Sequence, residues 1–125
     1  MDAVTARTVV LQTKDHGRVE FECPAWCIGH AWQAGAGIGR NDIVHKSVAV
    51  KAASDTYSYG YVSLLRVWMA WAPFAELVPR VSVEVDVQGD FEAEEIAHVA
   101  GALRTAANRM EQVAAQAIAF RGDVA

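Results

Sequence analysis

The chain has 125 residues, of which 53% are hydrophobic and 21% are charged, and its formal net charge is −4. This composition is typical of one globular domain spanning 1–125 and excludes a disordered chain. The acidic balance argues against a broad phosphate-binding surface, although it leaves room for a local basic patch. The start, MDAVTARTVV, lacks a basic segment followed by a long apolar one. We therefore expect no secretory signal, no membrane partner and a cytoplasmic protein.

Two β-rich runs open the chain, at 5–13 and 18–23. The KDHG segment between them ends in Gly17, which suits a hairpin turn. The small-residue segment QAGAGIGR at 33–40 predicts a loop. It resembles a phosphate-binding loop only superficially, because Arg40 stands where the dinucleotide fingerprint needs glycine.

Three further strands are predicted, at 42–52, 61–71 and 81–88, with a turn in SDTYSYG between the first two. A short helix is the alternative at 61–71, because three of its large apolar residues also share a helical face. The 81–88 run, VSVEVDVQ, is the clearest strand. Its valines alternate with polar residues, which predicts one buried and one solvated face.

The rest of the chain predicts one long helix at about 91–120, with glutamates near its positive N-terminal end. Its apolar residues recur at steps of three and four: Ile96, Val99, Leu103, Ala106, Met110, Val113 and Ala117. Such a helix is about 40 Å long, longer than one small sheet usually covers. Its alanine-rich surface is therefore available to a second subunit. The simpler alternative is a helix that only lies across its own sheet. The predicted fold class is α+β, an antiparallel sheet of four to five strands with one long C-terminal helix packed on a face.

The segment CPAWCIGH at 23–30 contains both cysteines of the chain. Cys27 and His30 have the spacing of a zinc knuckle, and the glycine between them favours a tight turn. Cys23 precedes Cys27 by four residues, and His45 stands near the start of the next predicted strand. The pattern is C-x3-C-x2-H-x14-H, with Asp42 or His16 as the alternative fourth ligand. Four protein ligands leave no open position, so we predict a structural zinc bound by Cys23, Cys27, His30 and His45.

Other interpretations of the two cysteines stay open. Cysteine is often a buried apolar residue without function, and two nearby thiols also suit a redox pair. Cys27 with His30 or His45 is a possible nucleophile and base, but no motif of a known cysteine-enzyme family is present, which favours a protein that is not an enzyme. Nucleic-acid binding through the aromatic residues is a second alternative, which the negative charge disfavours.

The CPAWC stretch, with His30 nearby and His45 at a strand start, resembles a small domain family of unknown function that is common in actinobacteria and their phages. Its members share a Cys-Pro-x-Trp-Cys motif, a nearby His and a second His at the start of a strand. The segment 91–112 is similar to the terminal helix of that family, and the resemblance extends over about 5–115. It implies that the Cys/His set acts together and that the protein is of phage or actinobacterial origin. It implies no reaction.

These observations together predict a small zinc-stabilised module that binds another protein. A host protein is the expected partner if the origin is a phage, with an accessory or regulatory role. A homodimer through the C-terminal helix is a further expectation. The alternatives are a cysteine-dependent enzyme or thiol redox protein and, less favoured, a nucleic-acid-binding protein.

Overall fold

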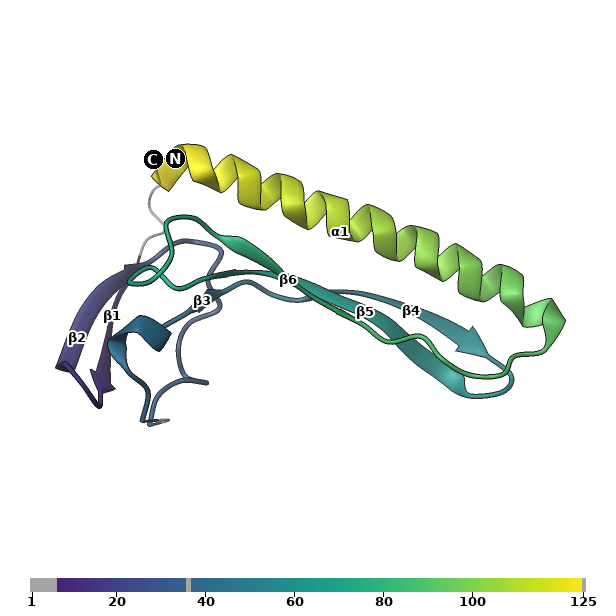
Figure 1. Cartoon of the computed structure of the whole chain (residues 1–125), viewed down its shortest axis with the longest axis horizontal. Coiled ribbons are helices and arrows are strands. Elements are labelled where there is room, and N and C mark those ends of the chain that lie inside the picture. The colour runs from purple at the N-terminus through teal and green to yellow at the C-terminus, as the bar shows by residue number, and fades with distance from the viewer. Residues whose placement is uncertain (1–6, 36, 125) are drawn as a thin grey trace.

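The computed structural model describes residues 7–35 and 37–124. It confirms the α+β class, with antiparallel sheets and one long helix packed against them (Figure 1). Residues 5 and 6 of the first predicted strand and Ala36 of the predicted loop lie outside the described residues. The elements are, in chain order, β1 (Arg7–Thr13), β2 (Gly17–Cys23), the 3-10 turn η2 (Arg40–Asp42), β3 (His45–Lys46), β4 (Val50–Thr56), β5 (Gly60–Trp71), β6 (Arg80–Val85), the 3-10 turn η3 (Ala93–Glu95) and α1 (Ile96–Val124).

The first two strands form the predicted hairpin. They pair in register from Arg7 opposite Cys23 to Thr13 opposite Gly17. Gly17 has a φ of 61°, a left-handed conformation that suits glycine at the turn. The hairpin is a separate two-stranded sheet and does not extend the main one. Its buried side packs around Cys23 rather than under the helix.

The main sheet is built around β5. Val67 is paired with Val50 on one edge of β5 and with Val83 on the other. Ala70 is likewise paired with Lys46 and Arg80. Because a strand has only two edges, β3 and β4 lie in line along one edge of β5, and β6 occupies the other.

The predicted strand at 42–52 is partly wrong. Pairing begins only at His45, because the preceding residues form η2, with the Ile43 amide donating to the Arg40 carbonyl at 3.2 Å. Pairing stops again after Lys46, where the Ser47 hydroxyl accepts a hydrogen bond from the Met69 amide of β5. It resumes at Val50 and continues to Thr56.

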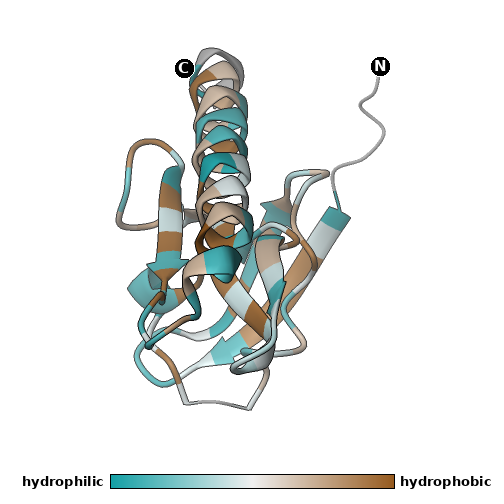
Figure 2. Ribbon diagram, turned by 90° about the vertical axis from the view of Figure 1, so that its right-hand side faces the viewer, coloured by the Kyte–Doolittle hydropathy of each residue, from teal (hydrophilic) through white to brown (hydrophobic). Residues whose placement is uncertain are grey.

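The segment 61–71 is a strand, and the helical alternative is wrong. Leu65, Val67 and Met69 alternate along β5 and pack together in one buried cluster, as a period of two requires. Figure 2 shows such alternation of apolar and polar residues along the strands.

Helix α1 packs on the face formed by β4 and β5. Its buried residues Ala106, Val113 and Ala117 contact the β-strand core, and Met110 and Phe120 pack at its margin. The predicted apolar stripe is only partly correct toward its N-terminal end, where Val99 is buried but Ile96 is 51% and Leu103 is 38% exposed. At 100° per residue, these two residues lie on the flank of α1 opposite to Arg109. Arg109 donates to the Lys51 carbonyl of β4, so the exposed flank faces β6.

The valines of β6 are buried less than their alternation predicts. Val81 packs against the core, whereas Val83 is 43% and Val85 is 57% exposed. The cause is the lateral position of α1, which covers β4 and β5 and reaches β6 with fewer contacts. Among the described residues, no helix is long and apolar enough to cross a membrane.

Candidate metal centre

The end of β2, a tight turn and the start of β3 bring the two cysteines and two histidines together. Cys23 is the last residue of β2, and the Cys27 amide donates to the Pro24 carbonyl at 3.0 Å, which closes the turn. Gly29 has a φ of 101°, so the chain reverses toward His30 at a position that suits glycine. The Ile28 amide donates to the Lys46 carbonyl at 2.9 Å, which joins the turn to β3.

The four candidate ligand atoms lie within 4.8 Å of one another. His30 Nε2 is 3.1 Å from Cys23 Sγ, 3.6 Å from Cys27 Sγ and 3.3 Å from His45 Nδ1. With ordinary Zn–S and Zn–N bond lengths, the edges of a zinc-centred tetrahedron are about 3.3 to 3.8 Å long. The three separations from His30 Nε2 are close to these edges, and all four atoms converge, so the set fits a tetrahedral ion.

All four side chains are buried. Burial, together with the neighbouring Cys27, raises the pKa of the Cys23 thiol to about 12. Burial, and then the nearby His30, lower the pKa of His45 to about 4. Without a cation, Cys23 is therefore a neutral thiol and His45 a neutral imidazole near neutral pH. A divalent ion with two thiolates and two neutral imidazoles has no net charge, which suits a buried site.

Gln33 orients His30, and sequence reasoning missed it. His30 Nδ1 donates to Gln33 Oε1 at 3.0 Å, which leaves Nε2 free to act as a ligand. The Gln33 amide is itself fixed, since its Oε1 accepts from the Val44 amide at 3.2 Å and its Nε2 donates to the Asp42 carbonyl at 2.9 Å. The only sequence signal was a polar residue three positions after a predicted ligand, in a loop of small residues.

Aromatic rings surround the cluster. The Phe21 ring stands edge-on to His30 with centroids 4.9 Å apart, and His45 lies 5.5 Å from Trp71. Trp26, between the two cysteines in the sequence, is 6.3 Å from His45 and 5.4 Å from Phe120 of α1. These rings exclude water from the cluster and connect it to the end of the helix.

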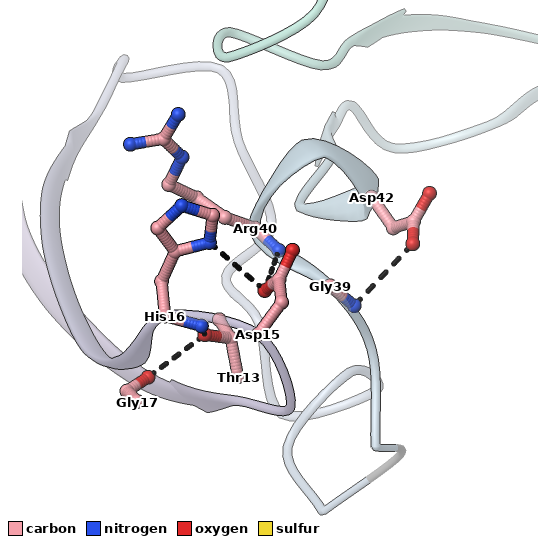
Figure 3. A network of polar contacts seen from close by, with 7 residues as sticks. All are labelled: Thr13, Asp15, His16, Gly17, Gly39, Arg40 and Asp42. Carbon is pink, nitrogen blue, oxygen red and sulfur yellow. Dashed lines mark hydrogen bonds and ion pairs between the residues drawn. The ribbon is translucent and has the colours of Figure 1, made fainter.

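The two alternative fourth ligands lie elsewhere. His16 Nδ1 is 3.1 Å from Asp15 Oδ1, and Asp42 Oδ2 accepts the Gly39 amide at 3.3 Å (Figure 3). Neither belongs to the group of converging ligand atoms. Among the candidates that we considered, His45 is therefore the fourth member of the cluster.

Asp15 holds the loop that precedes η2 against the first hairpin. Its Oδ1 accepts the Arg40 amide at 2.9 Å (Figure 3). This hydrogen bond, and then His16, lower the pKa of Asp15 to about 2. The Lys14 amide donates to the Ile38 carbonyl at 3.0 Å, which fastens the same loop a second time. The loop is thus held in the place from which Gln33 and His45 approach His30.

The described residues define a small α+β domain with a buried Cys2His2 cluster. The chain belongs to the family described as a domain of unknown function (DUF6907), whose model matches residues 8–119. No curated protein matches the chain. No solved structure matches it either.

Proposed function

We propose that this protein is a zinc-stabilised module that binds another protein, with Cys23, Cys27, His30 and His45 as the zinc ligands. The observation that carries the zinc assignment is the convergence of four buried ligand atoms at separations close to tetrahedral edges. Thiolate and imidazole are the ligands that zinc prefers.

The proposed zinc is structural. Four protein ligands fill a tetrahedral shell and leave no position for a substrate or an activated water. The ion would join the end of β2, the 27–30 turn and β3. Two surface cavities among the described residues, of about 610 and 510 Å³, are lined by residues outside the cluster. These features support a non-catalytic role over a cysteine-dependent enzyme.

The surface next to the cluster supports a protein partner. We define the Trp patch as Trp32, Lys46, Arg66 and Trp68. Lys46 Nζ lies 5.4 Å from the centroid of the Trp32 ring and 4.8 Å from that of Trp68. Trp32 is 50% exposed. Tryptophan and arginine are enriched among residues that dominate binding energy at protein interfaces.

The cluster positions this patch. Trp32 follows His30 by two residues, and its Nε1 donates to the Gly29 carbonyl at 3.0 Å. Lys46 directly follows His45. Both sides of the contact between Trp32 and Lys46 are therefore attached to candidate ligands, and zinc would hold them together.

Metal analysis tests the zinc assignment. Protein purified without added zinc should contain about one zinc per chain by inductively coupled plasma mass spectrometry. The C27S variant should contain almost none, whereas D42N should keep its zinc because Asp42 lies outside the cluster. Zinc-free wild-type protein with a Cys23–Cys27 disulfide would contradict the proposal and favour the redox alternative.

Site-specific photo-crosslinking tests the binding role. A benzophenone side chain at position 32 should capture a protein in cells that naturally express the chain, and chelation of zinc should abolish the capture. Position 57 is the matched control, because Tyr57 is also exposed but lies in the β4–β5 turn. Equal capture at both positions would contradict a role for the Trp patch. Salt-sensitive binding of nucleic acid through Trp32 would favour the second alternative.

The proposal includes a cytoplasmic location. A cytoplasmic location keeps thiols reduced and available to a metal. The resemblance carried by the Cys-Pro-x-Trp-Cys motif supports a phage or actinobacterial origin, with a host protein as the partner in the phage case.

A further inference from the structure

The outer edge of β6 carries backbone groups that no described residue pairs. The Asp86 amide donates to the Leu64 carbonyl at 3.1 Å, so the backbone of Asp86 faces β5. Backbone direction alternates along a strand, so Glu84 and Ser82 also face β5. Val81, Val83 and Val85 therefore direct their N–H and C=O groups outward. The same valines point their side chains to the face that carries α1.

The opposite edge of the sheet is protected. Arg109 of α1 donates to the Lys51 carbonyl of β4, so a helix side chain already occupies an outward backbone group of this edge. Covering side chains are one means by which proteins block unwanted strand pairing. β6 also carries charged side chains, Arg80 and Glu84, but within residues 7–35 and 37–124 no side chain bonds to its outward backbone groups, and Val83 and Val85 are about half exposed.

We propose that β6 pairs antiparallel with β6 of a second copy of this chain, with Val83 opposite Val83. This register places Val81 opposite Val85 of the second copy, so all three outward-facing valines form backbone hydrogen bonds. It also aligns the partly exposed valines side by side on one face, where β-branched pairs stabilise a sheet.

Charge complementarity selects this register. On the other face of the sheet, Arg80 lies opposite Asp86 of the second copy, and this pair occurs twice in the dimer. If the second copy is shifted by two residues in one direction, Glu84 lies opposite Glu84 of the second copy. A shift in the other direction places Pro79, which has no N–H, opposite Val85.

The proposed dimer differs from one through the C-terminal helix. Helix α1 lies over β4 and β5, so in a sheet joined at β6 the two helices would be about four strand spacings, or roughly 19 Å, apart. Helices in contact are separated by about 8–10 Å. The two copies would meet through their strands, and the helices would stand on either side of the paired valines.

Light scattering and amide exchange on the full chain test the proposal. The particle mass should approach twice the monomer mass of 13.5 kDa as concentration rises. In the dimer, the amides of Val81, Val83 and Val85 should be protected from hydrogen exchange. A monomer at all concentrations would overturn the proposal, as would a dimer in which these three amides exchange freely.

Variants distinguish a dimer through the β6 edge from a dimer through another surface. V83P removes only an outward N–H, a position that edge strands tolerate. It should weaken the dimer by about tenfold or more, whereas V83A keeps the N–H and should weaken it less. I118E, at an exposed position of α1, should leave it unchanged. If I118E abolishes the dimer and V83P does not, the helix is the interface and the proposal fails.

A charge exchange tests the register without proline. R80D should weaken the dimer several-fold by placing two acidic residues opposite each other. The double variant R80D/D86R restores opposite charges and should recover most of the affinity. If the double variant is as weak as R80D, the register is wrong.

Discussion

Gln33 determines which nitrogen of His30 faces the cluster. Its amide oxygen accepts the Nδ1 proton, and two backbone groups, Val44 N–H and Asp42 C=O, fix the amide. Such a partner orients a metal-binding imidazole and raises its basicity.

Replacing Gln33 with alanine should therefore weaken zinc binding by about 10- to 100-fold without removing a ligand. Competition with a chromophoric chelator measures this change. H45A, which removes a proposed ligand, should weaken binding far more, and H16A should have no effect because His16 pairs with Asp15. Equal affinity in Q33A and wild type would show that Gln33 does not support the site.

The proximity of the cluster residues could be predicted from the sequence where the determinants are local. Cys27 and His30 are three residues apart, so one tight turn around Gly29 is enough to bring them together, and spacing alone indicates it. The prediction of His45 as a ligand depended on its position near the start of a predicted strand. The structure brings His45 to the cluster, although the predicted strand was longer than the observed one. The role of Gln33 was not visible, because it depends on backbone groups nine and eleven residues away.

At the level of elements, the start of α1 is fixed by one carboxylate. Glu95 accepts hydrogen bonds from the amides of Tyr57 and Ser58, from the Ser58 hydroxyl at 2.9 Å and from the Glu92 amide at 2.9 Å. It thus joins the β4–β5 turn to the N-terminal end of the helix. Burial alone would raise the pKa of Glu95, but these hydrogen bonds from Ser58, Glu92 and Tyr57 outweigh it and lower the pKa below its usual value.

The lowered pKa of Glu95 predicts a pH-dependent contribution to stability. A carboxyl group whose pKa is lower in the folded state stabilises the fold above its unfolded pKa, and this stabilisation is lost as pH falls through the folded pKa. E95Q should therefore melt several degrees below wild type at neutral pH, and the difference should shrink in acid. Thermal unfolding followed by circular dichroism at a series of pH values measures this. A difference independent of pH would contradict the role of the charge.

The position of the helix across the sheet could not be predicted from periodicity. The stripe from Ile96 to Ala117 correctly predicts a packed face, but it does not state which strands that face covers. The strands that the helix covers are determined by long-range contacts. These are the contact of Glu95 with the β4–β5 turn and that of Arg109 with Lys51. They draw α1 toward β4, which leaves Ile96, Leu103 and the β6 valines partly exposed.

At the scale of the whole molecule, the shape is elongated (Figure 1), and the buried apolar residues form two clusters. One lies between α1 and the sheet, and the other surrounds Cys23 and Cys27. Few apolar contacts outside the cysteine cluster join the β1–β2 hairpin to the rest. Stability should therefore differ between the two ends.

Chelation of zinc should unfold one end first. Amides of β2 and β3 should lose protection from hydrogen exchange, while those of β4, β5 and the N-terminal half of α1 should keep theirs. Exchange measured by NMR with and without chelator resolves the two ends. Simultaneous loss of protection throughout the chain would instead show that the two clusters unfold as one unit.

Trp26 connects the Cys/His cluster to the C-terminal end of α1. Its ring contacts His45 on one side and Phe120 of α1 on the other, and its buried indole N–H has no hydrogen-bond partner among the described residues. In the proposed zinc-bound protein, metal loading and docking of the helix end would therefore share one side chain and be thermodynamically linked. By reciprocity, a ligand that holds the end of α1 in place would increase zinc affinity by the same factor by which zinc would increase the affinity for that ligand.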